Sequence, residues 1–203
     1  MRVGIFGGTF DPPHIGHINM CEVFIKELSL DKLYVIPTYI PPHKDVTSQT
    51  TAAQRYEMAK LAFSYVSDKI VVSDIEQKRQ GRSYTADTLR FFREQGYNDL
   101  FFLCGTDMFL SLDKWYNPEY IFESATIVCL RRESEKENDS RINEKINLYK
   151  QNYNGKTILL NSRAVEISSS EIRDAYKNGA CMSNYITEEI CNYIQLNKLY
   201  TDK

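Results

Sequence analysis

Residues 3–17 read VGIFGGTFDPPHIGH, and this stretch of the sequence decides the fold. A short apolar run, typical of a buried β-strand, leads into a glycine pair, a proline turn and two histidines three positions apart. At about 100° per residue, His14 and His17 share one face of a helix that begins near Pro13. The unpaired N–H groups at that helix start, together with glycines that let the backbone approach a ligand, predict a phosphate site.

The composition is that of an ordinary globular chain. Its 203 residues fit one domain, and 42% hydrophobic residues suffice for a core. The formal net charge of −2 gives no reason to expect a nucleic-acid partner. The first residues form no charged-then-apolar leader, and no apolar run approaches the length of a membrane span. We therefore expect a soluble, cytoplasmic protein that binds neither nucleic acid nor membrane.

The five cysteines lack the paired spacing of a zinc site, and their number is odd. Four of them lie in segments with apolar periodicity. We therefore expect buried, reduced thiols and no protein-bound metal. These residues are Cys21, Cys104, Cys129, Cys181 and Cys191.

Apolar runs alternate with longer amphipathic stretches along most of the chain. We expect strands over residues 2–6, 32–37, 70–74, 100–104, 125–130 and 156–161. We expect helices over residues 15–28, 51–65, 85–95, 169–178 and 187–197. Runs that are apolar on both faces suit a parallel sheet covered by helices. The alternation therefore predicts an α/β fold with a doubly wound, Rossmann-like parallel sheet flanked by helices.

The rest of the chain completes this organisation. Residues 131–154 are rich in charge and asparagine, and we expect a solvated loop followed by a surface helix. We expect one domain over residues 1–203, with the sheet core in 1–160 and a small helical cap in 161–203.

A second motif, VEISSSEIR, occupies residues 165–173. Serines before a helix are ordinary N-caps. Hydroxyls at a helix start, with Arg173 one turn inside it, also form an anion site. The residues alone leave both interpretations open. Neither GxGxxG nor GxxxxGK[ST] occurs, so a dinucleotide fingerprint and a Walker loop are absent from the sequence.

Together, HxGH after the first strand and ISSSEIR over residues 167–173 resemble the nucleotidyltransferase superfamily of adenylyltransferases. Within it, residues 7–17 are similar to bacterial nicotinate mononucleotide adenylyltransferases. So are the stretches IPPHK (40–44), SYTADTL (83–89), GTD (105–107) and KWY (114–116), and the likeness covers nearly the whole chain in order. The family usually has threonine at position 170, where Ser170 retains a hydroxyl.

The resemblance implies an ATP site built from both motifs. Backbone N–H groups and a hydroxyl would line the phosphates at Gly7, Gly8, Thr9 and Phe10. His14 and His17 would contact the phosphates, with His17 closest to the α-phosphate, and these two with Arg173 would be catalytic. The opposite wall, around the adenosine and the β- and γ-phosphates, would be Ser168, Ser169 and Arg173. Gly105 and Asp107 would meet the ribose, and Arg132 would add charge unless the adjacent Arg131 does so.

The resemblance also implies a site for the mononucleotide. Trp115, with Tyr116 beside it, would present a stacking face to the cationic pyridinium ring, although a tryptophan more commonly packs in the core. Thr85 would offer helix-start N–H groups to the nicotinate carboxylate, or serve as an N-cap, or do both. Lys44 would meet the mononucleotide phosphate, or else is a solvated loop lysine.

The implied reaction joins the AMP part of ATP to nicotinate mononucleotide and releases pyrophosphate. The phosphate nucleophile is already anionic, so no general base is required. Mg²⁺ is expected on the ATP phosphates, without a carboxylate cage from the protein. A homo-oligomer is an option that the residues leave open.

Other functions compete with this one. A phosphopantetheine adenylyltransferase shares the two end motifs but leaves Trp115 and residues 83–89 unexplained. A class I aminoacyl-tRNA synthetase also carries HxGH, but its lysine-rich signature is missing and the chain is short. A non-catalytic nucleotide-binding module would have no chemical need for both His17 and Arg173. An NAD-dependent oxidoreductase lacks support because GxGxxG is absent.

Overall fold

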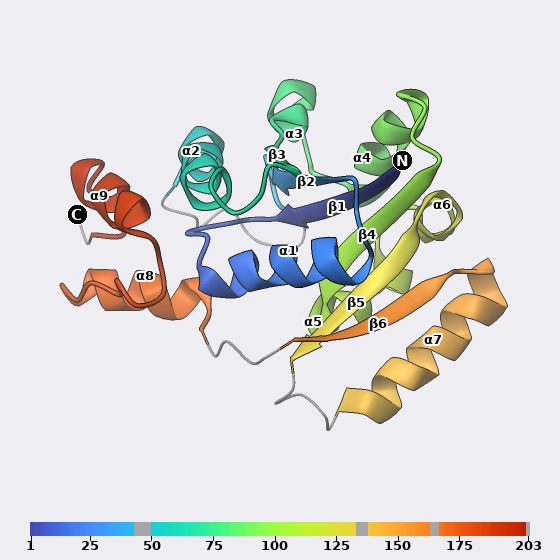
Figure 1. Cartoon of the computed structure of the whole chain (residues 1–203). Coiled ribbons are helices and arrows are strands. Elements are labelled where there is room, and N and C mark those ends of the chain that lie inside the picture. The colour runs from blue at the N-terminus through green and yellow to red at the C-terminus, as the bar shows by residue number, and fades with distance from the viewer. Residues whose placement is uncertain (43–49, 133–137, 163–166, 202–203) are drawn as a thin grey trace.

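A single parallel sheet organises the chain in the computed structural model, which describes residues 1–42, 50–132, 138–162 and 167–201. Its spatial order is β3-β2-β1-β4-β5-β6, and every neighbouring pair is parallel. This confirms the predicted doubly wound fold (Figure 1). The strands are β1 (Arg2–Gly8), β2 (Lys32–Pro37), β3 (Ile70–Val72), β4 (Asp99–Gly105), β5 (Thr126–Arg132) and β6 (Thr157–Ser162).

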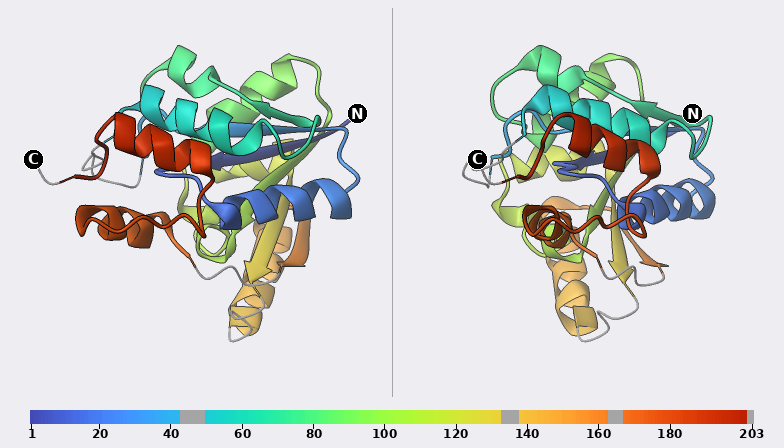
Figure 2. Two further views of the ribbon diagram at one scale, coloured as in Figure 1. Left: turned by 60° about the vertical axis from the view of Figure 1, so that its left-hand side comes forward. Right: turned by 90° about the vertical axis from the view of Figure 1, so that its left-hand side faces the viewer.

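Helices cover both faces of the sheet. The first layer contains α1 (Ile15–Glu27) and α2 (Ala52–Phe63), and α8 (Ser169–Lys177) and α9 (Glu188–Leu196) extend it beyond the carboxyl ends of the strands (Figures 1 and 2). The second layer contains α3 (Ile75–Arg79), α4 (Thr85–Glu94), α5 (Thr106–Phe109), α6 (Pro118–Ser124) and α7 (Asp139–Tyr153). A short 3₁₀ helix, η1 (Leu112–Lys114), lies between α5 and α6.

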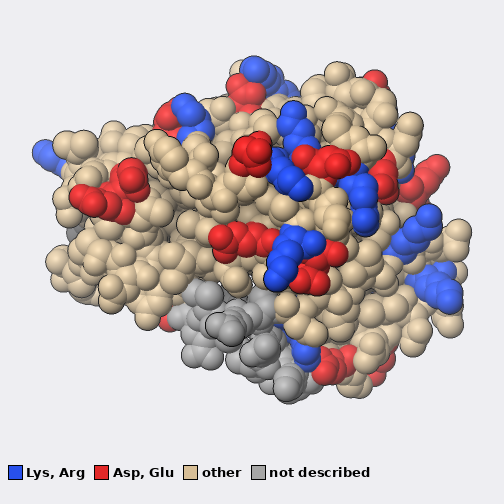
Figure 3. Space-filling model, viewed as in Figure 1, with Lys and Arg blue, Asp and Glu red and all other residues tan. Residues whose placement is uncertain are grey.

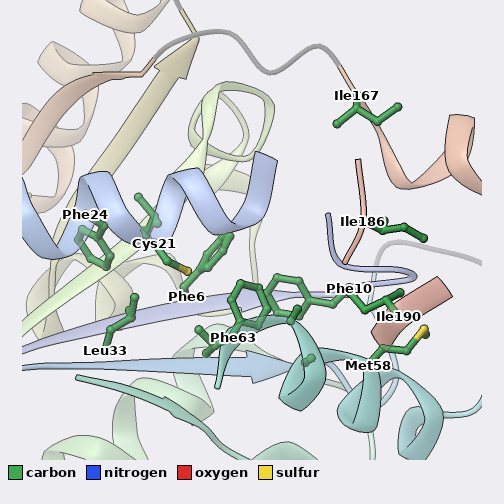
Figure 4. Packing of buried hydrophobic residues seen from close by; sticks show 14 of the residues in the cluster. Phe6, Phe10, Cys21, Phe24, Leu33, Met58, Phe63, Ile167, Ile186 and Ile190 are labelled. Atoms are coloured by element: carbon green, nitrogen blue, oxygen red, sulfur yellow. The ribbon is translucent and has the colours of Figure 1, made fainter. Parts of the chain in front are cut away.

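Side chains alternate between the two faces of the sheet along the central strands, and they pack into two separate hydrophobic cores. In β4, Phe101 and Leu103 face the α1 and α2 layer, whereas Phe102 and Cys104 face the opposite layer. This follows from the two-residue period of a strand, because successive side chains point to opposite faces. Figure 4 shows the first core, in which Ile186 and Ile190 of the C-terminal part lie beside Phe10 and Met58. The C-terminal part is therefore packed into the same apolar core as β1 and α2.

The predicted boundaries agree with the structure to within about two residues. The strand expected over 70–74 ends at Val72, because the chain turns there into α3. The short helices α3, α5, α6 and η1 were missing from the prediction, since segments of three to seven residues show no helical period. A local signal did exist at α6, which has Pro118 at its first position and Asn117 as its N-cap. The predicted helix in 131–154 is α7; it buries Ile142 and Tyr149, and residues 133–137 lie outside the described residues. The division between a core in 1–160 and a cap in 161–203 stays a prediction.

The cysteines and the surface complete the fold. Four of the five cysteines are buried as expected, whereas Cys181 is exposed, and all five are free thiols. None of the helices in the described part of the chain is long and apolar enough to cross a membrane. On the face shown in Figure 3, Lys and Arg side chains are interspersed with Asp and Glu.

The close packing around Gly4 predicts that a larger side chain there destabilises the protein. A Cβ at Gly4 would lie 2.6 Å from Leu30 Cδ1, 2.8 Å from Phe24 Cε1 and 2.9 Å from Leu33 Cδ1. Gly4→Ala should therefore lower the free energy of unfolding by about 1–3 kcal/mol, because the added methyl overpacks the core. Chemical denaturation measures this loss. The control is Gly7→Ala on the same strand, where a Cβ would meet nothing within 4 Å. Equal stability of the two variants would contradict the close approach at Gly4.

Candidate functional site

The first predicted site residues follow β1, at the point between β1 and β4 where the strand order of the sheet reverses. Strands β1 and β4 are neighbours, but β1 continues to β2 on one side and β4 continues to β5 on the other. In open α/β sheets, ligands bind outside the carboxyl ends of the strands at such a switch point. Phe6 pairs with Leu103, and two residues further along these strands stand Gly8 and Gly105. The two glycine loops therefore start side by side.

In the turn after β1, the side chain of Phe10 is buried in the core, whereas Gly7 lies at the surface. Phe10 has a φ of 50°, which is uncommon for a residue with a bulky side chain. Its ring is buried and contacts Phe6, Phe63 and His17 at centroid distances of 5.3, 5.4 and 5.1 Å. A Cβ at Gly8 would lie 2.8 Å from this ring. The side chain of Phe10 thus belongs to the core, while Gly7 remains exposed and Thr9 half-buried above it.

The two histidines face each other at the start of α1. Their ring centroids lie 3.8 Å apart, which confirms that both imidazoles project together from the first turn. The helix begins at Ile15 instead of Pro13, and His14 is its N-cap. His14 is buried and His17 half-buried. His14 therefore has a structural role as the cap of α1.

A reciprocal capping box fixes which ring nitrogens carry protons. The Gly16 N–H donates to His14 Nδ1 at 3.2 Å, and the His14 N–H donates to His17 Nδ1 at 3.3 Å. A ring nitrogen that accepts a backbone N–H carries no proton, so each neutral imidazole holds its proton on Nε2. In each imidazole the Nε2–H is thus the donor, and both rings lie at the positive end of α1. This arrangement suits an anionic oxygen between them.

The late serine motif meets the first loop across the molecule. Ser169 Oγ donates to the Pro12 carbonyl at 2.9 Å, and Arg173 Nη1 donates to the Asp11 carbonyl at 2.7 Å. Ser168 is the N-cap of α8 and forms a capping box with Glu171. The capping interpretation is therefore confirmed for Ser168, whereas the anion site stays a prediction. The structure brings the two motifs together, as the resemblance implied.

A buried carboxylate lies under this contact and was not anticipated from the sequence. Asp11 is 5% exposed, and its Oδ1 accepts hydrogen bonds from Thr50 Oγ1 and from the Tyr200 hydroxyl, both at 2.7 Å. Nearby, the buried Arg55 donates to the carbonyls of Thr50, Thr38 and Tyr39 at 2.8–2.9 Å. The only signal in the sequence was Arg55 on an otherwise apolar helix face, and nothing in the spacing identifies its partners.

Burial sets the charge states in this network. Burial, and then the Asp11 carboxylate, raise the pKa of Tyr200, so its phenol stays protonated and remains a donor. Burial lowers the pKa of Arg55, and the negative charge of Asp11 opposes that shift. The acidic Asp11 and the basic Arg55 are thus both buried, and their charges interact.

The loop after β4 offers open backbone beside the glycine loop of β1. Gly105 is the N-cap of α5, and a Cβ there would meet nothing within 4 Å. Asp107 is exposed in the first turn of this helix, and Thr106 between them is buried. Their geometry is compatible with the predicted ribose contact, and the contact itself stays a prediction.

The motifs assigned to the mononucleotide also meet. Residues Ile40 and Arg82 form a bridge, the Ser83 N–H donates to the Ile40 carbonyl at 2.9 Å, and the Tyr39 N–H donates to Ser83 Oγ at 2.8 Å. The start of IPPHK is therefore attached to SYTADTL just before α4. Thr88 of α4 donates to the buried Glu76 at 2.7 Å, which ties α4 to α3. Lys44 lies outside the described residues.

The structure places Thr85 at the start of α4 and Trp115 against the core. Thr85 is the first residue of α4, but the N-cap is Tyr84, so the expectation of Thr85 as a plain N-cap is wrong. The ring of Tyr84 lies 4.5 Å from that of the exposed Tyr116. Trp115 is half-buried: its ring packs edge-on to Phe102 at 6.2 Å, and its Nε1 donates to Ser111 Oγ at 3.4 Å. Trp115 thus contacts the core and also keeps surface exposed.

The contacts of Arg131 show where one member of the arginine pair at the end of β5 lies. Arg131 is buried, donates to Asn161 Oδ1 through Nε and Nη2, and pairs with Asp139. Its guanidinium is therefore engaged with β6 and α7. The side chain of Arg132 lies outside the described residues, so the contact assigned to it stays a prediction.

The fold and the paired motifs define a nucleotide-binding protein of the cytidylyltransferase-like class. The model of the cytidylyltransferase-like family matches residues 5–175 of this chain. The probable nicotinate-nucleotide adenylyltransferase of Listeria monocytogenes serotype 4a is 34% identical over 203 residues, which is 100% of this chain and 98% of that protein. That of Clostridium beijerinckii is 35% identical over 204 residues, with 98% of each chain covered. The chain therefore belongs to the cytidylyltransferase-like family and, within it, to the nicotinate-nucleotide adenylyltransferases.

Solved structures agree with this fold. The nicotinic acid mononucleotide adenylyltransferase of Plasmodium falciparum complexed with NaAD has a TM-score of 0.76 and 22% identity, covering 98% of this chain and 97% of that one. The same enzyme complexed with APC has a TM-score of 0.74 and 21% identity, covering 98% and 96%. At this identity the likeness concerns the fold alone.

Tyr200 provides a test of the buried network. Tyr200→Phe removes one hydroxyl donor from the Asp11 carboxylate, so the free energy of unfolding should fall by about 1–3 kcal/mol. Urea denaturation measures the change. Tyr65→Phe is the matched control, because that side chain is 85% exposed. If both variants unfold at the same urea concentration as the wild type, the hydrogen bond to Asp11 contributes no net stability.

Proposed function

We propose that this chain transfers the adenylyl group of ATP to nicotinate mononucleotide, giving nicotinic acid adenine dinucleotide and pyrophosphate. The observation that carries the proposal is the pair of imidazoles that face each other at the start of α1, at the switch point of the sheet. Full-length similarity to the relatives above supports the choice of substrates.

The chemistry follows from the charges of the reactants. An oxygen of the mononucleotide phosphate forms a bond to the α-phosphorus of ATP, and the bond from that phosphorus to the bridging oxygen of pyrophosphate breaks. The nucleophile is already an anion, so the protein need not remove a proton. Its tasks are to align the two phosphates and to stabilise the charge that develops on the α-phosphate and the leaving group. Donors serve that purpose, and the motifs supply histidines, hydroxyls, an arginine and backbone amides.

On the ATP side, His14 and His17 donate through Nε2 to oxygens of the triphosphate, with His17 at the α-phosphate. The backbone of Gly7, Gly8, Thr9 and Phe10 lies along the same phosphates, and Gly7 is the exposed residue among them. Arg173 uses Nη1 and Nη2 for the Asp11 carbonyl and Ser170 Oγ. A guanidinium has five N–H groups, so donors remain for the β- and γ-phosphates. Ser168, Ser169, Gly105, Asp107 and Arg132 complete this half of the proposed site.

On the mononucleotide side, the first turn of α4 at Thr85 receives the nicotinate carboxylate, because helix-start N–H groups favour anions. The pyridinium ring stacks on Trp115, where a cation over an indole is stabilised by roughly 1 kcal/mol or more. Tyr116 extends this aromatic surface, and Lys44 meets the phosphate. The contact between Tyr84 and Tyr116 supports a shared site for the two segments.

Mg²⁺ is proposed to arrive with the ATP phosphates. Across residues 1–42, 50–132, 138–162 and 167–201, no group of three His, Cys, Asp or Glu side chains is placed to hold a metal ion. Phosphate oxygens and water satisfy Mg²⁺ without such a group. When bound, the ion offsets charge on the leaving pyrophosphate.

We also propose a single nucleotidyltransferase domain over residues 1–203 and a cytoplasmic location. The four buried free thiols support that location, because reduced cysteines are usual in that compartment.

His17 tests the proposed catalytic role. His17→Ala should reduce turnover by about 10²–10³-fold, because it removes a donor from the α-phosphate. Pyrophosphate release from Mg-ATP and nicotinate mononucleotide measures the rate, and parallel reactions with the amide mononucleotide and with phosphopantetheine test the substrate.

His17→Gln separates catalysis from folding. Glutamine at the third helical position can keep the capping box, so this variant should fold as stably as the wild type and still lose most of its activity. Lys60→Ala, on the exposed side of α2, is the control that should change neither property. Near wild-type pyrophosphate release by both His17 variants would overturn the assignment.

Trp115 tests the mononucleotide half of the site. Trp115→Ala should raise the KM for nicotinate mononucleotide by about fivefold, since roughly 1 kcal/mol of ring stacking is lost, and change the KM for ATP much less. Tyr116→Ala should show the same selective effect at a smaller magnitude. A matching rise in both KM values would mean that Trp115 only supports the core around Phe102.

A further inference from the structure

We propose that Cys181 and Cys191 form a modification site that a peroxide converts into an intramolecular disulfide. The connection between α8 and α9, residues 178–187, carries Cys181, and α9 carries Cys191 (Figure 2). Their sulfur atoms lie 3.6 Å apart. The two thiols are therefore already in contact, and a modest movement of the connection brings them to bonding distance.

The two thiols differ in the way that a peroxide-reactive pair requires. Cys181 is exposed, whereas Cys191 is buried. The Tyr176 hydroxyl lies 3.5 Å from Cys181 Sγ. Its hydrogen bond lowers the pKa of Cys181, and burial raises that of Cys191. Cys181 thus meets the oxidant as the more readily ionised thiol, and Cys191 waits beside it as the resolving thiol.

The reaction balances with a peroxide as the oxidant. The Cys181 thiolate attacks one peroxide oxygen, the O–O bond breaks, and the leaving oxygen takes a proton to give water when the oxidant is hydrogen peroxide. The resulting sulfenic acid is attacked by the sulfur of Cys191, which forms the S–S bond and expels a second water. Overall, two thiols are oxidised and one hydrogen peroxide is reduced to two waters.

The other cysteines provide an internal contrast. Cys104 and Cys129 pair in register on β4 and β5, but both are buried in the second core. Burial raises the pKa of Cys104 and of Cys21. These thiols should react with peroxide far more slowly, because thiolate character and access both control the rate. Proximity of two sulfurs alone therefore does not select the site; exposure of one partner does.

Peptide mapping of the full chain tests the proposal without any activity assay. Residues 178–198 contain both cysteines and no internal Lys or Arg, so trypsin releases the pair on one peptide. After brief hydrogen peroxide treatment, thiol blocking and digestion, that peptide should appear two hydrogen atoms lighter. It should form at least about tenfold faster than any product at Cys21, Cys104 or Cys129, and dithiothreitol should restore both thiols.

Variants define the two roles. In Cys191→Ala, Cys181 should stop at a sulfenic acid that dimedone traps, and in Cys181→Ser, Cys191 should stay reduced. Cys129→Ala, the matched control, should form the disulfide as the wild type does. The proposal is overturned if wild-type Cys181 is oxidised while Cys191 stays free, if disulfides link separate chains, or if the buried cysteines react first. The wild-type map decides the matter even if the Cys191 variant folds poorly.

Discussion

The buried carboxylate of Asp11 accepts hydrogen bonds from Thr50, just ahead of α2, and from Tyr200, near the end of the chain. Its own carbonyl accepts from Arg173 of α8. Segments up to 189 positions apart therefore converge on one residue, three positions before His14. A buried carboxylate is costly unless it is hydrogen-bonded, so the fold is constrained to bring these donors together. The position of the histidine turn depends on that constraint.

The contacts that cap α1 also orient the two histidines. Their Nδ1 atoms cap the first turn of α1, so the rings are held by the backbone of the helix that they serve. Each ring then has one possible tautomer when neutral, with the proton on Nε2. Donors held in advance need no reorganisation as charge develops on a phosphate, which is the property that makes electrostatic catalysis effective. In the proposed mechanism, a structural role and a chemical role are combined in these two side chains.

The sequence predicted the sheet well because its strands are apolar on both faces and are bounded by turn residues. The HxGH spacing also predicted the facing imidazoles, since helix geometry relates positions three apart. It did not predict the network of Asp11, Arg55 and Tyr200, because those partners are non-local and no periodicity reports them. Nor did it separate Ser168, a helix cap, from Ser169, which binds the Pro12 carbonyl; adjacent serines differ only once α8 is placed. The sequence therefore predicts strands and helix faces, which depend on neighbouring residues, but not hydrogen bonds between residues far apart in the chain.

Arg173 shows why that long-range pairing matters for function. An arginine on an exposed helix would lose side-chain entropy on binding a phosphate. Here the Asp11 carbonyl and Ser170 Oγ already fix two of its nitrogens, and the remaining N–H groups keep a set direction. The contact that attaches the C-terminal part to the first loop thus also holds the guanidinium that we propose binds the β- and γ-phosphates. A variant that loosens Asp11 should disturb both walls of the proposed ATP site at once, because the histidine turn and Arg173 are held by the same residue.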